Sequence, residues 1–427
     1  MSRPAPGHRV LVKTDKQKAE GILLPPQTLT GRKTTVIKLD SGYNLGFLDN
    51  QIKSIRSLGV GGKTDDDKHI NPPYFEGKPN VSVLSTGGTI SSKVDYRTGG
   101  VSAKYTSQDL LYSMPELSGQ VNIHTKNPLN VMSEDMNPRQ WVDLAHSVCE
   151  EINSGSDGIV ITHGTDTMHY SAAALSFLLA AAPCPVVFTG SQRSIDRGSS
   201  DGFLNLACAI NLAKSDFRGV CIVMHQNMSD NLCSAHLGTR ARKMHTSRRD
   251  AFWSINCPPL AQITSGGEIE FNSPKHGRKE NNRDLEVSGG FNEKVAFIKA
   301  YPGMNPELVD FYVDKNYEGI VFEGTALGHL PVSFEKYSLL SAVERARDSG
   351  LVLAMTTQCL FGRVHPHVYS NLRELSSRGV IYCGDMLPEV SYVKLMWVLD
   401  KVCDLGGVRR MLLQPHAGEI SKSSTIL

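Results

Sequence analysis

The chain has 427 residues, of which 40% are hydrophobic and 21% charged. At about 150 residues per domain, this length predicts two or three domains, and the hydrophobic share excludes disorder along the whole chain. The 45 Lys and Arg residues against 43 Asp and Glu residues leave a formal charge of +2. That balance excludes a strongly basic nucleic-acid-binding protein but not a local basic patch.

Nine cysteines are spread through the chain, and no two of them form a C-x-x-C pair. An odd number at wide spacing does not fit a disulfide framework or a zinc finger, so we expect reduced thiols in a cytoplasmic protein. No apolar segment typical of a secretory signal is visible near residue 1. The most apolar stretch, 172–188, contains Pro183 and Pro185, which favours a buried helix and a strand over a membrane span.

Short strands are predicted in the N-terminal part of the chain. Between about residues 7 and 58, short apolar runs are separated by turn residues such as Pro25-Pro26. This spacing is typical of a small β-barrel. The glycine-containing, charged segment 61–68 then indicates a solvated linker. The sequence therefore predicts a small β-barrel domain with its linker over residues 1–75.

Strands and helices alternate from about residue 80 onward. A helix is expected from about Thr167 to Ala182, and strands are expected at 81–85, 157–162, 186–188 and 219–224. Such alternation predicts an α/β domain, over 76–275, with a mostly parallel sheet and helices on both faces.

The alternation of strands and helices resumes after a polar stretch at 265–294, for which we expect loops or a hairpin. The later strands are expected at 295–298, 319–322, 351–355 and 379–382. We therefore predict a second, smaller α/β domain over 293–427.

Two of the predicted strands end in turns rich in glycine and hydroxyl groups, 86–89 (TGGT) and 163–167 (HGTDT). In doubly wound sheets, ligands bind outside the carboxyl ends of the strands, and glycines let the backbone approach them closely. Taken singly, the first turn could be a tight strand-to-helix connection and the second an N-cap cluster. A phosphate loop is excluded because no Gly-Lys-Ser/Thr follows at the required spacing, and the absence of G-x-G-x-x-G disfavours a dinucleotide-binding loop. The two turns together predict a functional site.

A hydroxyl nucleophile needs a nearby base because it does not ionise at neutral pH. A lysine can be that base when burial or a neighbouring charge favours its neutral form. Lys243 lies in the basic run 240–246, which spacing alone assigns to a solvated surface. Histidines such as His163, His225 and His236 lack metal-ligand spacing, so we predict no metal site.

The two threonine motifs in combination resemble the paired signature of bacterial-type L-asparaginases. The resemblance runs from about residue 80 to the C-terminus and includes the segments 188–193, 200–206 and 242–246. It implies an α/β fold, namely an asparaginase-like two-domain parallel-sheet core preceded by the small N-terminal β-barrel.

This resemblance also implies catalytic roles. Thr89 becomes the primary nucleophile on the side-chain amide carbonyl. Thr165, Asp166 and Lys243 become a second cluster, in which Lys243 activates a hydroxyl or water and Asp166 holds Lys243 or the substrate amine. Which threonine attacks first stays open.

Substrate-binding residues follow from the same resemblance. Ser133 and Glu134 lie in a segment similar to the family's Asp-Ser-x-Asp-Met, which grips the amino-acid end of the substrate. A capping cluster for the following helix is the alternative. Gly88 and Gly164 belong to the turns whose backbone N–H groups would meet the developing negative oxygen. Tyr96 falls in the loop that corresponds to the family's mobile lid, although the loop length differs.

The N-terminal β unit is additional to an asparaginase core. Together with the linker and the continuation Met168-His169-Tyr170, it resembles the D subunit of archaeal glutamyl-tRNA(Gln) amidotransferases. That family hydrolyses glutamine or asparagine and passes the ammonia to the E subunit, which converts Glu-tRNA(Gln) to Gln-tRNA(Gln). The resemblance implies no cofactor in this chain, ATP and Mg²⁺ use by the partner, and tRNA(Gln) binding mainly through the partner. It also implies self-association through the asparaginase-like core, a cytoplasmic location and no membrane.

Three alternatives stay open. The nearest is a free-standing L-asparaginase with an accessory domain. A second is a non-catalytic scaffold with the same fold. The third treats the β-barrel as a nucleic-acid module, but its few aromatics, such as Tyr43 and Phe47, make a poor stacking platform.

Overall fold

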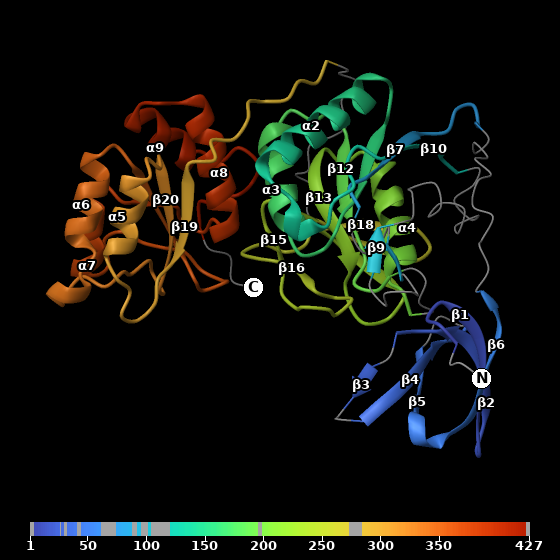
Figure 1. The fold of residues 1–427 in the computed structure, drawn as a ribbon. Helices are drawn as coiled ribbons and strands as arrows, with labels where there is room; N and C mark the ends of the chain where they lie inside the picture. The colour runs from blue at the N-terminus through green and yellow to red at the C-terminus, as the bar shows by residue number, and fades with distance from the viewer. Residues whose placement is uncertain are drawn as a thin grey trace.

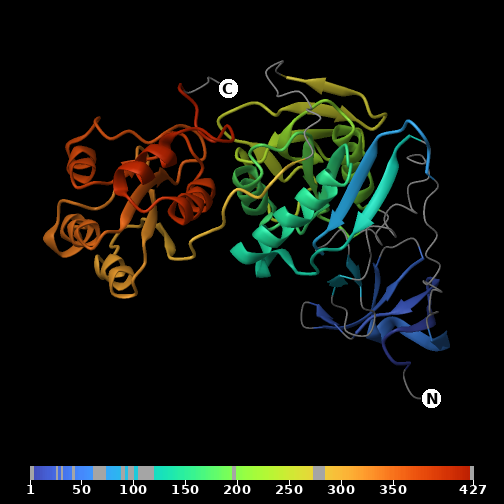
Figure 2. The same cartoon turned by 90° about the horizontal axis from the view of Figure 1, so that it is seen from above.

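The structure is a computed structural model that describes residues 4–25, 27–29, 32–40, 44–60, 74–87, 92–94, 101–103, 120–194, 199–272 and 284–423. Three units follow one another along the chain: an antiparallel β unit, a larger α/β unit and a smaller α/β unit (Figure 1). The larger α/β unit lies between the other two in both Figure 1 and Figure 2.

The N-terminal unit is an antiparallel sheet around a small core. Its strand order is β3-β4-β2-β1-β6, and β5 also pairs with β4. The core consists of the buried side chains of Val10, Val12, Leu23, Ile37 and Phe47. The predicted linker at 61–68 lies outside the described residues. The strands are β1 (His8–Thr14), β2 (Lys18–Leu23), β3 (Gln27–Leu29), β4 (Arg32–Lys38), β5 (Asn44–Leu48) and β6 (Ile52–Val60), with a 3₁₀ turn at Asp49–Gln51.

The sheet of the middle unit has eight strands in the order β10-β7-β11-β12-β13-β14-β17-β18. The first five are parallel and the last three are added antiparallel. They are β7 (Asn80–Ser85), β10 (Asn122–Lys126), β11 (Gly158–Thr162), β12 (Pro185–Thr189), β13 (Gly219–His225), β14 (Leu232–Leu237), β17 (Ala261–Thr264) and β18 (Ile269–Phe271). The chain leaves β7 to one side for β10 and returns to its other side for β11, so the strand order reverses between β7 and β11. Doubly wound sheets bind ligands at such a switch point.

Two short strand pairs lie outside the large sheet. β8 (Ser92–Val94) pairs with β9 (Val101–Ala103), and β15 (Ala241–Lys243) pairs with β16 (Phe252–Ser254). The strand β15 lies within the basic run 240–246 and includes Lys243.

Helices cover both faces of the middle sheet, as predicted. α2 (Pro138–Asn153) and α3 (Met168–Leu178) lie on one face, and α4 (Gly202–Ala213) lies on the other. α3 ends at Leu178 rather than at the predicted Ala182. The proline at position 183 explains part of this difference, because a residue before proline is disfavoured in the helical conformation.

The C-terminal unit is a parallel sheet in the order β19-β20-β21-β22 with helices on both faces. α5 (Glu307–Asp314), α6 (Leu340–Asp348) and α7 (Ser370–Ser377) pack on one face. α8 (Pro388–Lys401) and α9 (Leu405–Leu413) belong to the core on the other face. The strands are β19 (Val295–Lys299), β20 (Gly319–Gly324), β21 (Val352–Thr357) and β22 (Ile381–Tyr382), and a 3₁₀ turn spans Glu335–Tyr337.

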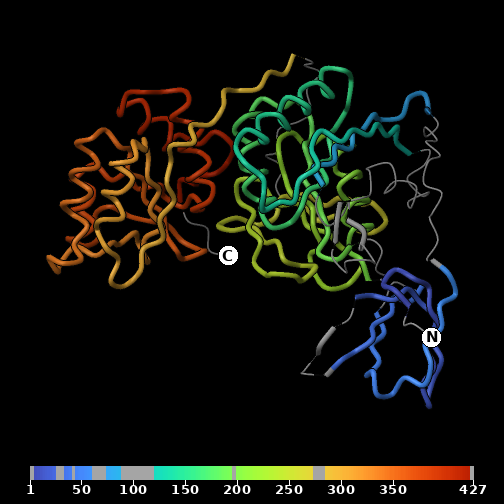
Figure 3. The backbone as a smooth tube through the Cα atoms, in the orientation of Figure 1, coloured from blue at the N-terminus to red at the C-terminus, as the bar shows by residue number. Residues whose placement is uncertain are grey.

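The two α/β units share one hydrophobic core, in which α8 packs against α3. The rings of Phe177 and Trp397 stack across this contact with centroids 5.4 Å apart. The connecting segment 284–294 runs beside it (Figure 3) and is tied to α8 by the Trp397 indole N–H, which donates to the carbonyl of Ser288 at 2.7 Å. The units are therefore joined by packing as well as by the chain. Within the described ranges, no helix is long and apolar enough to cross a membrane.

The close approach of β11 to α4 gives a test of the fold. A Cβ added to Gly158 would lie 2.0 Å from the carbonyl oxygen of Ala213. We expect Gly158→Ala to lower the free energy of unfolding by about 1–3 kcal/mol, because overpacking forces backbone shifts. Urea denaturation measures this change. Gly266→Ala is the control, since its Cβ would find its nearest neighbour at 3.6 Å; equal denaturation midpoints for the two variants would contradict the packing described.

Candidate active site

The two predicted motif turns meet at the switch point of the middle sheet. Ser85 at the end of β7 pairs with Thr162 at the end of β11. Thr86 continues this contact, because its backbone N–H and its hydroxyl both donate to the carbonyl of Thr162, at 3.0 and 3.1 Å. Gly87 then adopts a φ of +103°, and a Cβ there would lie 2.6 Å from the carbonyl of Val131. This position therefore requires glycine.

Three predicted site residues, Gly88, Thr89 and Tyr96, lie outside the described residues. Their roles as oxyanion donor, primary nucleophile and lid stay predictions. What the structure does place is the point from which the first turn leaves the sheet, beside the start of the second turn.

Lys243, Thr165 and Asp166 form one hydrogen-bonded group. The Lys243 Nζ donates to the Thr165 hydroxyl at 2.8 Å and to Asp166 Oδ1 at 2.7 Å. The lysine side chain is only 10% exposed, whereas that of Asp166 is 64% exposed. A hydroxyl at this distance from an amine can exchange a proton with it directly. The Asp166 carboxylate holds the Lys243 amine beside the Thr165 hydroxyl.

Ser133 lies against the second motif turn. It is buried on the 3₁₀ turn Ser133–Asp135, where its Oγ accepts a hydrogen bond from the Asp166 N–H at 3.3 Å. Gly164 packs directly on it, since an added Cβ would lie 2.7 Å from the Ser133 Oγ. Glu134 is exposed beside this contact. The structure thus brings Ser133, Gly164, Asp166 and Lys243 into one chain of contacts.

The capping interpretation is wrong for Ser133 and Glu134, and in the second turn it holds only for the position of Thr167. The N-cap of α2 is Asn137, which forms a capping box with Gln140, so Ser133 and Glu134 are not its cap. Thr167 occupies the N-cap position of α3 without a side-chain capping bond. Its hydroxyl donates instead to the carbonyl of Ser133 at 2.6 Å. The polar side chains of these turns therefore connect the turns to each other rather than finishing helices.

Two buried histidines flank the second turn in their neutral form. Burial lowers the pKa of His163 to about 4, against an opposing effect of its contact with the Gly164 carbonyl, 2.6 Å from Nδ1. Burial, followed by the positive charges of Arg242 and Lys243, lowers the pKa of His169 to about 3. A neutral His163 can donate Nδ1–H to the Gly164 carbonyl and fix the turn.

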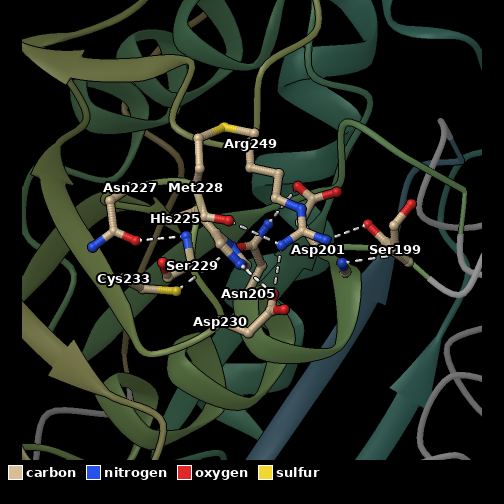
Figure 4. Close-up of polar contacts among 12 residues, drawn as sticks. Ser199, Asp201, Asn205, His225, Asn227, Met228, Ser229, Asp230, Cys233 and Arg249 are labelled. Carbon is tan, nitrogen blue, oxygen red and sulfur yellow. Dashed lines mark hydrogen bonds and ion pairs between the residues drawn. The ribbon is translucent and has the colours of Figure 1, made fainter.

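Asp201 and Asn205 belong to a polar network (Figure 4) that reaches the second motif turn through Gly190. Asp201 accepts hydrogen bonds from the backbone N–H groups of Gln192 and Arg193 and from the amide of Asn205. That Asn205 amide also donates to the carbonyl of Gly190 at 2.9 Å. Gly190 in turn packs on the second motif, where an added Cβ would lie 3.1 Å from the Thr165 methyl group.

The same network continues to the surface of the unit. His225 joins Asn205 to Asp230, and Arg249 donates to Asp230 at 2.8 Å (Figure 4). Partial burial raises the pKa of Asp230, but the hydrogen bonds and charges of His225 and Arg249 lower it overall. The sequence indicated 188–193 and 200–206 only as family segments, and this supporting role was missed. Within the described ranges, no group of three or more His, Cys, Asp or Glu side chains is arranged to hold a metal ion.

The comparisons with known proteins agree with this architecture. Residues 80–276 match the family "Asparaginase, N-terminal", residues 294–412 match "Glutaminase/Asparaginase C-terminal domain", and residues 5–58 match "GatD N-terminal domain". The glutamyl-tRNA(Gln) amidotransferase D subunit of Pyrococcus furiosus is 48% identical over 409 residues, which are 95% of this chain and 92% of that protein. The chain belongs to the family of glutamyl-tRNA(Gln) amidotransferase D subunits. The family and the fold class predicted from the sequence are both confirmed.

Other relatives and solved structures support the same assignment. The D subunit of Thermococcus kodakarensis is 49% identical, covering 94% of this chain and 90% of that protein. The thermostable L-asparaginase from Thermococcus kodakarensis has a TM-score of 0.72 and 34% identity, covering 81% of this chain and 100% of that structure. L-asparaginase I from Vibrio cholerae has a TM-score of 0.68 and 29% identity, covering 81% of this chain and 99% of that structure. The asparaginase structures are thus matched over their full length by only part of this chain.

Buried neutral histidines predict a loss of stability in acid. Burial lowers the pKa of both His163 and His236 to about 4, from a usual value of 6.5. Between these pH values the unfolded chain binds protons that the folded chain does not, so stability falls as the pH falls from 6.5 towards 4. Each histidine accounts for about 3 kcal/mol of this loss.

Urea denaturation at pH 7 and pH 4.5 checks this expectation. His236→Gln should lose less stability between the two pH values than the unmodified protein. His365→Gln, which changes an exposed histidine of the C-terminal unit, is the control. The burial argument fails if the two variants show the same pH dependence.

Proposed function

We propose that the chain hydrolyses the side-chain amide of glutamine or asparagine and supplies the ammonia to a partner subunit that converts Glu-tRNA(Gln) to Gln-tRNA(Gln). Its family makes it an amidohydrolase subunit of a tRNA-dependent amidotransferase, which favours this function over a free-standing asparaginase. One observation supports the chemistry above all: Lys243 contacts both Thr165 and Asp166 at the switch point.

The reaction we propose is acyl transfer through a threonine. Thr89 attacks the amide carbon, its hydroxyl proton passes to the leaving nitrogen, and the C–N bond breaks to release ammonia. Water then hydrolyses the acyl-enzyme to glutamate or aspartate and restores the Thr89 hydroxyl. In this scheme a neutral Lys243 takes the proton from the Thr165 hydroxyl or from the attacking water. Asp166 keeps the amine in place and stabilises its protonated form after the transfer.

Substrate binding is assigned to the residues around this group. The exposed carboxylates of Glu134 and Asp166 suit the α-ammonium group of an amino-acid substrate. The hydrogen bond from the Asp166 N–H to the Ser133 Oγ fixes the backbone of Asp166. We assign the backbone N–H groups of Gly88 and Gly164 to the negative oxygen of the tetrahedral intermediate, where one good donor contributes about 3 kcal/mol. Tyr96 is proposed as part of a lid over the site.

The partner supplies the remaining chemistry in this proposal. The relatives are named as one subunit of an amidotransferase, and the N-terminal unit matches a family specific to that subunit. We therefore propose that the E subunit is the partner, that ATP and Mg²⁺ are used there, and that tRNA(Gln) binds mainly there. Self-association through the asparaginase-like core is proposed as well.

Removal of the proposed base tests the site. Lys243→Ala should lower ammonia release from glutamine or asparagine by about 10²- to 10⁴-fold, because general base catalysis is lost. Circular dichroism should stay unchanged. Lys401→Ala is the control, since that lysine is on α8 and donates to the Ser288 hydroxyl. A Lys243→Ala variant as active as the control would remove Lys243 from the mechanism.

The role of the partner is tested by separate assays. Ammonia release is measured with each amide for the chain alone and for the chain with the E subunit and tRNA. We expect formation of Gln-tRNA(Gln) only when both subunits are present, since the ammonia source and the tRNA-binding part are different chains. Full amidase activity of the isolated chain, with no copurifying partner and no effect of the E subunit, would favour the free-standing asparaginase.

A further inference from the structure

The strand that carries Lys243 has charged side chains on both faces. Because side chains alternate along a strand, Arg242 points away from the side on which Lys243 meets Thr165. Arg240, just before β15, shares the orientation of Arg242. The sequence assigned this basic run to a solvated surface, but Arg240 is 1% exposed.

Both arginines are bound by the C-terminal unit. The Arg240 guanidinium donates to Asp385 at 3.1 Å, to the carbonyl of Gly418 at 2.9 Å and to the hydroxyl of Ser421 at 2.8 Å. The Arg242 guanidinium donates to Glu389 at 3.2 Å. These four partners come from the first turn of α8, the residues just before it and the segment that follows α9, far from Lys243 in the sequence.

Of the two ion pairs, Arg242–Glu389 is the nearer to Lys243, because Arg242 directly precedes Lys243 in the sequence. The Glu389 side chain is 3% exposed, and in the described part of the chain its second oxygen has no hydrogen-bond partner. Burial raises the pKa of Glu389, and Arg242 opposes this effect. A buried charge pair of this kind is costly to break, because the remaining charge is then uncompensated.

The two cations of β15 act on the same buried group. The charges of Arg242 and Lys243 both lower the pKa of His169, so both lie within electrostatic reach of that ring. After burial, the charge of Glu389 also raises the pKa of Tyr170, and the charge of Glu323 also raises the pKa of Glu389. Lys243 therefore has a neighbouring positive charge whose counter-ion is supplied by the other α/β unit.

We propose that Arg242 and Glu389 are positioning residues for Lys243, and that the C-terminal unit fixes the place and the electrostatic surroundings of the base through this ion pair. The role of this ion pair in catalysis rests on the proposed function, but its effect on the Lys243 amine does not. Through the ion pair the smaller α/β unit becomes part of the amidase site, although that unit contributes no residue to the Thr165–Lys243–Asp166 group.

The test follows the titration of the Lys243 amine in the full-length protein. The protein is acetylated competitively with acetic anhydride at a series of pH values. Mass spectrometry of the Lys243 peptide then gives the pH at the midpoint of the titration of this amine. In Glu389→Gln the Arg242 charge is uncompensated, so the midpoint should fall by about half a pH unit or more. In Arg242→Met the Glu389 charge is uncompensated, so the midpoint should rise by a similar amount.

Two further variants separate charge from packing. Arg242→Lys keeps the charge and should leave the midpoint near that of the unmodified protein. Arg345→Gln removes a bidentate pair with Asp310 on another face of the C-terminal unit and should change nothing at Lys243. Shifts in the same direction for Glu389→Gln and Arg242→Met, or no shift in either, would overturn the proposal.

Steady-state kinetics then connect the ion pair to ammonia release. We expect Glu389→Gln to lower kcat by about tenfold with KM within twofold, because the base is displaced while the substrate-binding residues are not. A rise in KM with kcat unchanged would contradict a positioning role. Absence of ammonia release from the unmodified protein with its partner would refute the proposed function, while the acetylation experiment would still decide the coupling.

Discussion

Parallel pairing of β7 with β11 is the constraint on which the site depends. With Ser85 beside Thr162, the two glycine turns leave the sheet at the same point and Thr86 can bind back to the neighbouring strand. A slip of one residue would turn every side chain of β11 to the opposite face. The buried cores on both sides of the sheet prevent that slip, since each contains alternate residues of these strands.

The shared core joins the second motif turn to the C-terminal unit through α3. α3 begins directly after the second motif turn and is buried along nearly its whole length, between the middle sheet and α8. A helix with apolar residues on all sides needs such enclosure. The residues that pack around α3 therefore also fix the Thr165 turn at its start. The ion pairs of Arg240 and Arg242 bind the β15 segment, which carries Lys243, to the C-terminal unit.

Much of this arrangement could be predicted from the sequence. Glycine turns after two buried strands indicated a site, and the combination of motifs indicated the family. The burial of Arg240 could not be predicted, because its acidic partner Asp385 is 145 residues away and a basic run by itself is typical of a solvated surface. The contact of Ser133 with Asp166 was missed for a similar reason: a polar cluster before a helix resembles a cap until the position of Asn137 is known.

The bonds of Arg240 to the end of the chain have a consequence for biosynthesis. Arg240 and Ser421 are separated by 181 residues, so the strand that carries Lys243 is made long before the groups that bind Arg240. A nascent chain that has reached only the middle unit has Arg240 and Arg242 without their carboxylates. Domains fold in order as they emerge during synthesis. The contacts that bind Arg240 and Arg242 are therefore completed late, when the C-terminal residues have folded onto the middle unit.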